Sequence, residues 1–470
     1  MYDQDSARGA APVVDPPRTL SLRRNMAFAV GGMGAFHACQ LGVIIVLAKF
    51  APPEVLGQVQ FSLAVATPIL MFCSLELRAA LVADAGGKFT FGTYRTLRAT
   101  TSGLAAAVLG GVAVWEYVAE GSAAFALILA GMVAGKLVLA QAEIDWGLFQ
   151  KRERLDWLAA SAALRGVTML AAFAAFVPLY SFLSRRGLVT PERLVHGAVL
   201  AVGVHVLASV VILVGFDRPR VIARLDYDAS WTWAAVRRLA RQTLPLGLVL
   251  LLLHLCNSVP QLFLERQDGG KAALGHFSAL FNLTMAGNLL VFQAANAAAH
   301  RLATYYQTEL GRFLRLAGKL LGVAAVVGVV SLVIALTVGR WLLRVLYRPD
   351  YADHYDEFKL IVLAQALALL TSVLGVLTIQ MRLFWLQVPV QLVILLTTTL
   401  AAAWLIPHAE NLVRGGALTV VVRAVVHAAL YGGCVLIGIL LRPRLLARGA
   451  AAGKVPLVPT PQTDDALQEW

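Results

Sequence analysis

The chain has 470 residues, of which 59% are hydrophobic and 14% charged, and its formal net charge is +13. A mean hydropathy of +0.72 excludes an ordinary soluble domain, because the apolar residues form runs that approach the thickness of a bilayer. These runs are continuous rather than alternating, which favours transmembrane helices over a β-barrel. We attribute the excess positive charge to basic loops at the cytoplasmic membrane surface rather than to nucleic-acid binding.

Twelve apolar segments are long enough to cross about 30 Å of hydrocarbon as helices. The chain is therefore predicted to be an all-α, polytopic membrane protein. The segments are residues 25–49, 58–82, 99–119, 122–145, 157–183, 194–216, 243–264, 273–298, 317–346, 357–380, 388–406 and 415–441. Composition predicts that residues 1–20 and 442–470 are disordered tails.

The first hairpin of the chain recurs near its middle. Four positions match at an offset of 217 residues: Leu22 and Leu239, Arg24 and Arg241, His37 and His254, and Cys39 and Cys256. Leu56-Gly57 likewise recurs as Leu274-Gly275, at an offset of 218. An internal repeat of this kind is typical of transporters. It predicts two six-helix bundles, residues 21–216 and 243–441.

Residues 217–242 form the longest predicted loop and separate the two halves. Within it, residues 229–242 place Trp231, Trp233, Val236 and Leu239 among basic side chains. This pattern predicts an amphipathic helix lying at the membrane surface. Its simplest role is that of a linker, and a regulatory role is the alternative.

Orientation follows from the distribution of Lys and Arg between alternate loops. If the N-terminus is inside, the inner segments hold about 25 basic residues and the outer segments about 9, counted within the predicted boundaries. The positive-inside rule therefore places both termini in the cytoplasm. No outer loop is long enough for an extracytoplasmic catalytic domain.

Ionisable groups predicted at membrane depth are the main candidates for function, because they are costly unless they line a water-filled path or bind a ligand. The candidates are Glu76, Arg78, Lys136, Glu143, Arg165, Arg423 and His427. We predict that Arg78, Lys136, Arg165 and Arg423 form a cationic substrate site. Glu76, Glu143 and His427 are predicted to tune its charge or to couple transport to an ion.

Each of these residues also has a simpler structural interpretation. Arg78 lies near the inner end of its segment and can extend to the headgroups. Glu143 can neutralise Lys136 or Arg165 as a structural pair. Lys136 and Arg165 are too deep to reach the headgroups easily, so a position on a shared cavity is the stronger interpretation for them.

The sequence contains no recognisable enzyme or metal motif. There is no aspartate-rich magnesium motif in a loop, no nucleotide-binding lysine loop and no Ser/His/Asp arrangement that we can place. The four cysteines all lie inside apolar runs, where they are typical of small buried side chains. We predict no catalytic residues, no metal site and no cofactor.

Several segments resemble bacterial polysaccharide-biosynthesis flippases, which belong to the multidrug/oligosaccharidyl-lipid/polysaccharide exporter (MOP) superfamily. These segments are residues 72–84 (FCSLELRAALVAD), 91–98 (FGTYRTLR), 148–156 (LFQKRERLD), 301–306 (RLATYY) and 346–351 (LYRPDY). The resemblance covers about residues 20–440. It implies two six-helix bundles around a central cavity that opens alternately to each side.

The resemblance also implies a cargo, an oligosaccharide linked to undecaprenyl pyrophosphate. The cargo would move from the cytoplasmic to the periplasmic leaflet of the bacterial inner membrane during surface polysaccharide biosynthesis, which includes lipopolysaccharide and exopolysaccharide. Membrane lipids and other polysaccharide-assembly proteins are the further expected partners, and nucleic acid is not one. Two alternatives remain open: a multidrug or small-molecule antiporter of the same fold, and a membrane enzyme or assembly protein of a polysaccharide pathway. The multidrug branch often relies on an acidic residue in its first helix, and residues 25–48 contain none.

Overall fold

The computed structural model describes residues 22–443, apart from residues 85, 191–192, 226, 286, 288–290, 292–293, 296–297 and 382. The predicted tails, residues 1–20 and all but the start of 442–470, lie outside the described residues. Every regular element among the described residues is helical. Eleven of these helices are long and apolar enough to cross a membrane, which confirms the all-α, polytopic fold.

The first half of the chain contains α1 (Leu22–Phe50), α2 (Pro53–Ser74), α3 (Leu77–Ala83), α4 (Phe91–Glu120), α5 (Ala123–Lys151), α6 (Leu155–Arg185), α7 (Leu194–Ile212), the π-helical turn η2 (Leu213–Asp217) and α8 (Arg218–Arg224). The second half contains α9 (Trp233–Glu265), α10 (Gly270–Thr284), α12 (Ala299–Thr308), α13 (Leu310–Leu346), the 3-10 turn η3 (Pro349–His354), α14 (Tyr355–Gln380), α15 (Phe384–His408) and α16 (Leu412–Leu440). The predicted eighth span, residues 273–298, begins within α10 and continues into residues that are only partly described.

Each half forms a bundle with the same order of helix contacts. In the first bundle α1 packs on α6, α6 on α7, and α5 on both α4 and α7. In the second bundle α9 packs on α15, α15 on α16, and α14 on both α13 and α16. Two helical segments of 29 residues, Leu194–Ile222 and Leu412–Leu440, also begin and end 218 positions apart. This offset agrees with the internal repeat read from the sequence.

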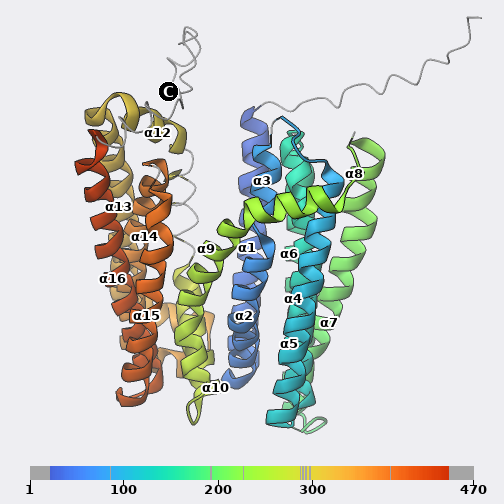
Figure 1. Cartoon of the computed structure of the whole chain (residues 1–470). Helices are drawn as coiled ribbons and strands as arrows, with labels where there is room; N and C mark the ends of the chain where they lie inside the picture. The colour runs from blue at the N-terminus through green and yellow to red at the C-terminus, as the bar shows by residue number, and fades with distance from the viewer. Residues whose placement is uncertain are drawn as a thin grey trace, which may run out of the picture.

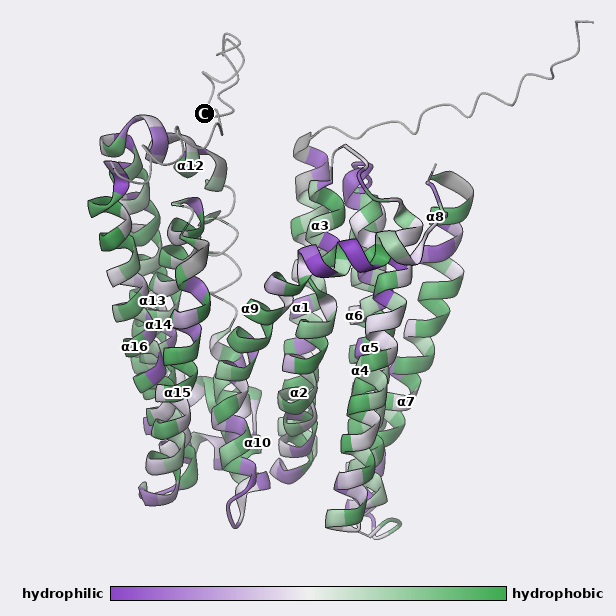
Figure 2. Cartoon of the chain, viewed as in Figure 1, coloured by the Kyte–Doolittle hydropathy of each residue, from purple (hydrophilic) through white to green (hydrophobic). Residues whose placement is uncertain are grey.

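The two bundles are joined through α2, α9 and α10 (Figure 1). The bundles diverge toward the end of the molecule where α1 begins and α16 ends (Figure 1). The helices α7, α13 and α16 are largely hydrophobic (Figure 2), and their exposed apolar side chains include Leu207, Val326 and Leu436. Exposed apolar surface of this extent is expected where lipid replaces water around a helix bundle.

The halves touch most closely where α2 meets α10. A Cβ atom on Gly57 would lie 2.0 Å from the carbonyl oxygen of Lys271, and one on Gly275 would lie 2.0 Å from that of Pro53. Pro53 and Lys271, like Gly57 and Gly275, are 218 positions apart, so the same contact occurs twice with the halves exchanged. We call these four residues the glycine seam, because only glycine allows the two backbones to approach so closely.

The region predicted as a separate linker, residues 217–242, is different in the structure. It contains α8, a short irregular segment and the first turns of α9, which continues without interruption from Trp233 to Glu265. The Thr232 hydroxyl accepts a hydrogen bond from the backbone N–H of Ala235 and so caps α9 at its start. The boundary at residue 242 is therefore wrong, because the basic residues that suggested a loop belong to a membrane-spanning helix.

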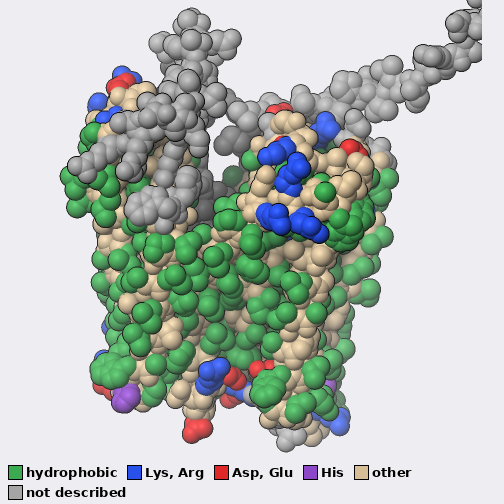
Figure 3. Space-filling model, in the orientation of Figure 1, with side chains coloured by type: hydrophobic (Ala, Val, Ile, Leu, Met, Phe, Trp, Pro, Cys, Tyr) green, Lys and Arg blue, Asp and Glu red, His purple; other side chains and the backbone are tan. Residues whose placement is uncertain are grey.

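The amphipathic character predicted for residues 229–242 is nevertheless present at the start of α9. Val236 and Leu239 are buried against the first bundle, whereas Trp233, Arg237 and Arg238 are exposed. This part of α9 crosses the first bundle before the helix changes direction toward the second (Figure 1). Pro245 lies inside α9, and proline is a common cause of such a kink. Lys and Arg side chains gather on the same end of the molecule (Figure 3).

The predicted second span is broken between α2 and α3. Leu75 and Glu76 both have left-handed backbone angles, with φ of 49° and 50°. For residues other than glycine this conformation costs roughly 1–2 kcal/mol each. The Leu75 side chain is buried, and the backbone N–H of Glu76 donates to the Ser74 hydroxyl over 3.4 Å. These contacts hold the break in a conformation that the backbone alone disfavours.

We expect Glu76→Gly to raise the thermal stability of the purified protein, because glycine adopts the left-handed conformation without this cost. The gain should be about 1 kcal/mol. Ala79→Gly in the adjacent turn of α3 is the control, since it adds a glycine to right-handed helix and should lower stability by about 0.5–1 kcal/mol. Thermal unfolding in detergent measures both. Equal losses in the two variants would contradict a strained backbone at Glu76.

Candidate functional site

A cavity of about 190 Å³ lies within the first bundle, where it faces α10 of the second. Most of its wall is apolar and comes from α1, α2, α5, α6 and α7. Its polar lining residues are Gln40, Gln60, Lys136, Arg165, His205, Ser209 and Asn282. Among the residues predicted for a cationic site, the structure brings Lys136 and Arg165 together on this cavity.

Lys136 contributes a positive charge to the cavity from the middle of α5. Its ammonium group has no hydrogen-bond partner within 3.5 Å and no carboxylate within 4.0 Å among the described residues. Glu143, two turns along α5, interacts with it only through the longer-range electrostatic field. His205 and His254 also lie close enough to interact electrostatically with the Lys136 ammonium group. Lys136 is therefore available to an anionic ligand.

Arg165 lines the same cavity but its charge is neutralised. Its Nη2 atom lies 2.8 Å from Oδ2 of Asp217, and its Nη1 donates to the carbonyl oxygen of Ser209 over 3.1 Å. The two side chains of this ion pair are only 1% and 0% exposed. Asp217 closes the π-helical turn η2, a type of irregularity that often occurs at functional sites. Arg165, predicted for the cationic substrate site, therefore lines the cavity with a carboxylate partner of its own.

A second ion pair, between α8 and α5, lies beside the first. Nε of Arg218 lies 3.1 Å from Oδ2 of Asp145, whose side chain is fully buried. Asp145 and Asp217 are close enough to interact electrostatically, so the two pairs form one network between α5, α6, η2 and α8. Sequence reasoning missed both acids, because Asp145 was the last residue of one predicted span and Asp217 followed the end of another.

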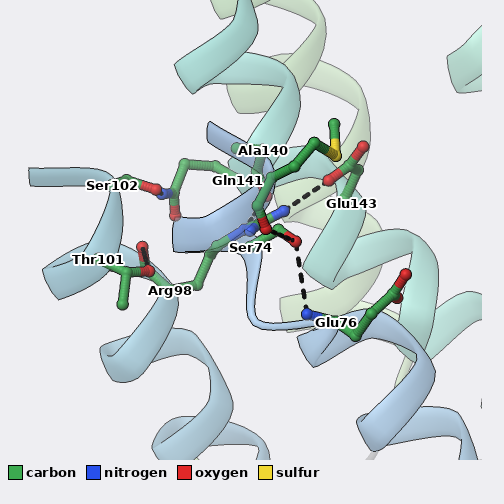
Figure 4. Close-up of polar contacts among 9 residues, drawn as sticks. Ser74, Glu76, Arg98, Thr101, Ser102, Ala140, Gln141 and Glu143 are labelled. Atoms are coloured by element: carbon green, nitrogen blue, oxygen red, sulfur yellow. Dashed lines mark hydrogen bonds and ion pairs between the residues drawn. The ribbon is translucent and has the colours of Figure 1, made fainter. Parts of the chain in front are cut away.

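Glu143 pairs with Arg98 rather than with Lys136 or Arg165. Nη2 of Arg98 lies 2.5 Å from Oε2 of Glu143, and its Nε donates to the carbonyl oxygen of Ala140 over 2.8 Å (Figure 4). Arg98 is only 4% exposed, although its position before the predicted third span had placed it in a loop. The structure thus supports the structural interpretation of Glu143 but corrects its partner.

Glu76 approaches this pair from the break between α2 and α3. Figure 4 draws no contact between its side chain and that of Arg98 or Glu143, although it interacts with both electrostatically. The side chains of Gln141 and Ser102 join α5 to α4 nearby, with a distance of 3.0 Å between Nε2 and Oγ. The described residues give Glu76 no ion pair of its own at contact distance.

The remaining predicted residues do not line this cavity. Nη2 of Arg78 donates to Oε1 of Gln150 over 3.2 Å, and its guanidinium lies 5.8 Å from the centre of the Trp146 ring. Arg423 and His427 belong to α16 in the second bundle. The four cations predicted for one site are therefore divided, with Arg78 near the end of α5 and Arg423 in the other half.

Arg423 has a polar but uncharged environment. Its Nη1 donates to Oδ1 of Asn257 over 2.7 Å and to the carbonyl oxygen of Cys256 over 3.2 Å. The ring of His427 lies 4.8 Å from that of Tyr431 in an edge-to-face arrangement. Among the described residues no group of three His, Cys, Asp or Glu side chains is arranged to hold a metal ion.

The fold is shared with known transporters. The chain is similar to a multidrug resistance MATE family transporter of the MOP superfamily in its inward-facing conformation, with a TM-score of 0.64 and 12% identity over 90% of this chain and 98% of that one. It is similar to the lipid II flippase MurJ in an inward closed conformation, with a TM-score of 0.63 and 9% identity over 91% and 93% of the two chains. A MOP superfamily transporter from Pyrococcus furiosus matches with a TM-score of 0.61 and 14% identity over 90% and 95%.

Sequence similarity is weaker but covers most of the chain. The capsular polysaccharide biosynthesis protein CapF of Staphylococcus aureus is 24% identical over 397 residues, which are 84% of this chain and 94% of that protein. No family model matches the chain. The structural likenesses confirm the fold predicted from the sequence.

Proposed function

We propose that this chain is a flippase for a lipid-linked oligosaccharide. Its fold is similar to that of MOP superfamily transporters, the superfamily that its sequence also resembles. It would move a saccharide on a polyprenyl diphosphate carrier from the cytoplasmic to the periplasmic leaflet of a bacterial inner membrane. The observation that carries this proposal is Lys136, an unneutralised cation on a cavity inside the membrane-spanning bundle. The similarity to a protein named for capsular polysaccharide biosynthesis supports the same pathway.

The chemistry of the cavity suits a diphosphate group. A lysine ammonium is a compact charge with three donors, and its attraction to phosphate strengthens where water is scarce. Gln40, Gln60 and Asn282 supply carboxamides, each of which both donates and accepts hydrogen bonds. A volume of about 190 Å³ limits the cavity to a small headgroup. The saccharide would then extend into the space between the two bundles.

The arrangement of the bundles supports an inward-facing state. The glycine seam joins the halves at one end, and Nζ of Lys49 donates to the carbonyl oxygen of Val345 across the same end over 3.2 Å. The opposite end carries the basic residues that the positive-inside rule assigns to the cytoplasm. In this orientation both termini are cytoplasmic and a headgroup enters from the inner leaflet.

A multidrug antiporter is the alternative with structural support, since the TM-scores to a multidrug transporter and to a lipid flippase are nearly equal at 0.64 and 0.63. The fold therefore does not separate the two functions, and the charge of the site must do so. Typical drug cations would be repelled by Lys136. The helix segment Ala27–Phe50 also contains no acidic residue. The third function, a membrane enzyme of the pathway, predicts a chemically altered lipid.

We expect Lys136→Gln to lower the initial rate of flipping by about 10–100-fold, the effect of losing a hydrogen bond to a charged group worth about 1.5–3 kcal/mol. The assay uses liposomes that contain the purified protein and a fluorescent short-chain polyprenyl diphosphate disaccharide. Lys136→Arg should retain part of the rate. Lys319→Gln, which removes an exposed lysine from α13, is the matched control.

Two results would contradict the proposed function. An unchanged rate in Lys136→Gln would remove Lys136 from the substrate site. Transport of a cationic dye with no flipping of the disaccharide lipid would favour the antiporter. Recovery of the lipid without its sugar or diphosphate would instead indicate an enzyme.

A further inference from the structure

Arg423 differs from the other deeply buried arginines. Arg98, Arg165 and Arg218 each lie within 3.1 Å of a carboxylate oxygen. Arg423 is only 8% exposed, yet its hydrogen bonds go to the amide of Asn257 and the carbonyl of Cys256, neither of which carries a charge. No described carboxylate lies within 4.0 Å of it. A buried charge without a counter-charge is costly, and such residues commonly bind a ligand.

The internal repeat places Arg423 at a position equivalent to one on the cavity. With the offset of 218 that relates the ends of Leu194–Ile222 and Leu412–Leu440, Arg423 corresponds to His205. With the offset of 217 that relates His37 to His254, Asn257 corresponds to Gln40. His205 and Gln40 both line the cavity of the first bundle. Arg423 and Asn257 are therefore the second-half copy of that cavity wall.

Asn257, the partner of Arg423, is the accessible member of this wall. His254 lies one turn before Asn257 on α9 and interacts electrostatically with Lys136 of the first half. Residues three apart on a helix share a face, so Asn257 lies on the same side of α9. The Asn257 side chain is exposed and contacts Arg423 directly. Arg423 is therefore reached from the exposed side of α9 through Asn257.

Two neighbours of Arg423 that are not buried, Asn257 and His427, have the chemistry of a saccharide site. The His427 ring packs against Tyr431, whose hydroxyl accepts a hydrogen bond from Nε2 of the buried Gln391 over 3.0 Å. Amide, imidazole and hydroxyl groups pair with sugar hydroxyls, while the planar guanidinium matches the two oxygens of a carboxylate. A lysine is a point charge and lacks that geometry.

We propose that Arg423 and Asn257 form a second anion subsite, which binds a carboxylate on the saccharide while the diphosphate lies at Lys136. The proposal rests on the proposed flippase function and makes it more specific, because the cargo is then an acidic oligosaccharide. In this state the ligand supplies the counter-charge that Arg423 lacks in the protein alone.

The test measures binding of three short-chain lipids to the full-length protein in nanodiscs. They are a polyprenyl diphosphate disaccharide that ends in glucuronic acid, the same lipid ending in glucose, and the polyprenyl diphosphate alone. The wild-type protein should bind the glucuronic acid lipid at least about 10-fold more tightly than the glucose lipid, the effect of a charge-assisted hydrogen bond. Arg423→Gln should lose this preference and bind the glucose lipid unchanged. Arg423→Lys should keep part of the preference.

Controls separate this subsite from the diphosphate site. Lys136→Gln should weaken all three lipids by a similar factor, whereas Arg414→Gln, which alters an exposed arginine on the same helix, should change none. Thermal unfolding shows whether Arg423→Gln remains folded, and the glucuronic acid lipid should raise the unfolding temperature of the wild-type protein more than that of this variant.

The possible failures have different meanings. Equal affinity of the wild-type protein for the two sugar lipids would overturn the acidic subsite but leave the flippase proposal intact. An equal loss of all three lipids in Arg423→Gln would assign Arg423 to the diphosphate site and also overturn the second subsite. Absence of binding to every lipid would reject the flippase function and the subsite with it.

Discussion

Asp217→Asn is expected to lower the stability of the folded protein by about 3–5 kcal/mol, the usual effect of leaving one member of a buried ion pair without its partner. Arg165 and Asp217 are 1% and 0% exposed, so water cannot replace the lost carboxylate. Arg165→Ala should be nearly as harmful, since it leaves Asp217 as a buried anion. Reversible unfolding in mixed micelles, followed by circular dichroism, measures the difference.

A double variant and a surface pair make this prediction specific. Arg165→Met with Asp217→Leu replaces both charges by apolar groups, and such exchanges are often neutral or stabilising. Its stability should exceed that of either single variant. Glu309→Gln breaks the exposed pair between Glu309 and Arg312, whose side chains are 51% and 56% exposed, and should cost less than about 1 kcal/mol. If Asp217→Asn behaved like Glu309→Gln, the buried pair would have no structural importance.

This pair also changes how loss of transport at position 165 is interpreted. The sequence analysis placed Arg165 in the cationic substrate site, so a loss of transport in Arg165→Ala would have been assigned to substrate binding. The buried ion pair predicts that such a variant is destabilised as well. Transport in the double variant is therefore the informative measurement. We expect it to persist, since Lys136 rather than Arg165 carries the unneutralised charge of the cavity.

The sequence predicts the spans and the deep cations well, because both depend on hydropathy alone. It predicts their partners poorly for a physical reason: a span drawn from hydropathy ends at its first charged residues. Asp217 followed the predicted segment 194–216, and Arg98 preceded the predicted segment 99–119. In the structure the helices continue past these points, so the charges assigned to loops complete ion pairs inside the protein.

The start of α9 was misjudged for the same reason. Its basic residues suggested a loop between two domains, yet they lie on the exposed side of a helix whose other side is buried. The repeat shows a different limit of sequence reasoning. Gly57 and Gly275 were identified as equivalent positions, but equivalence does not reveal contact. The structure adds that the two backbones meet at these glycines.

Gly57→Val and Gly275→Val are expected to shift the protein strongly away from the closed seam. The added Cβ atom would lie 2.0 Å from a backbone oxygen of the opposite half, and a backbone atom cannot move aside as a flexible side chain can. Overpacking a close contact costs typically about 1–3 kcal/mol, which corresponds to a change of roughly 5–150-fold in the ratio of closed to open molecules. Transport should be largely lost in both variants.

Spin labels on Leu188 and His408, which are exposed near the seam end of the two halves, report the opening as a longer distance in pulsed electron spin resonance. The labels are placed in a variant whose native cysteines are replaced. Gly103→Val is the matched control, because a Cβ at this helical glycine meets no atom within 4 Å. A distance distribution that stays the same in both seam variants would mean that the contact does not close this end. The added atom clashes only in the state in which the two halves touch, and it raises the free energy of that state alone. The population therefore shifts toward the state in which the halves are separated at the glycine seam.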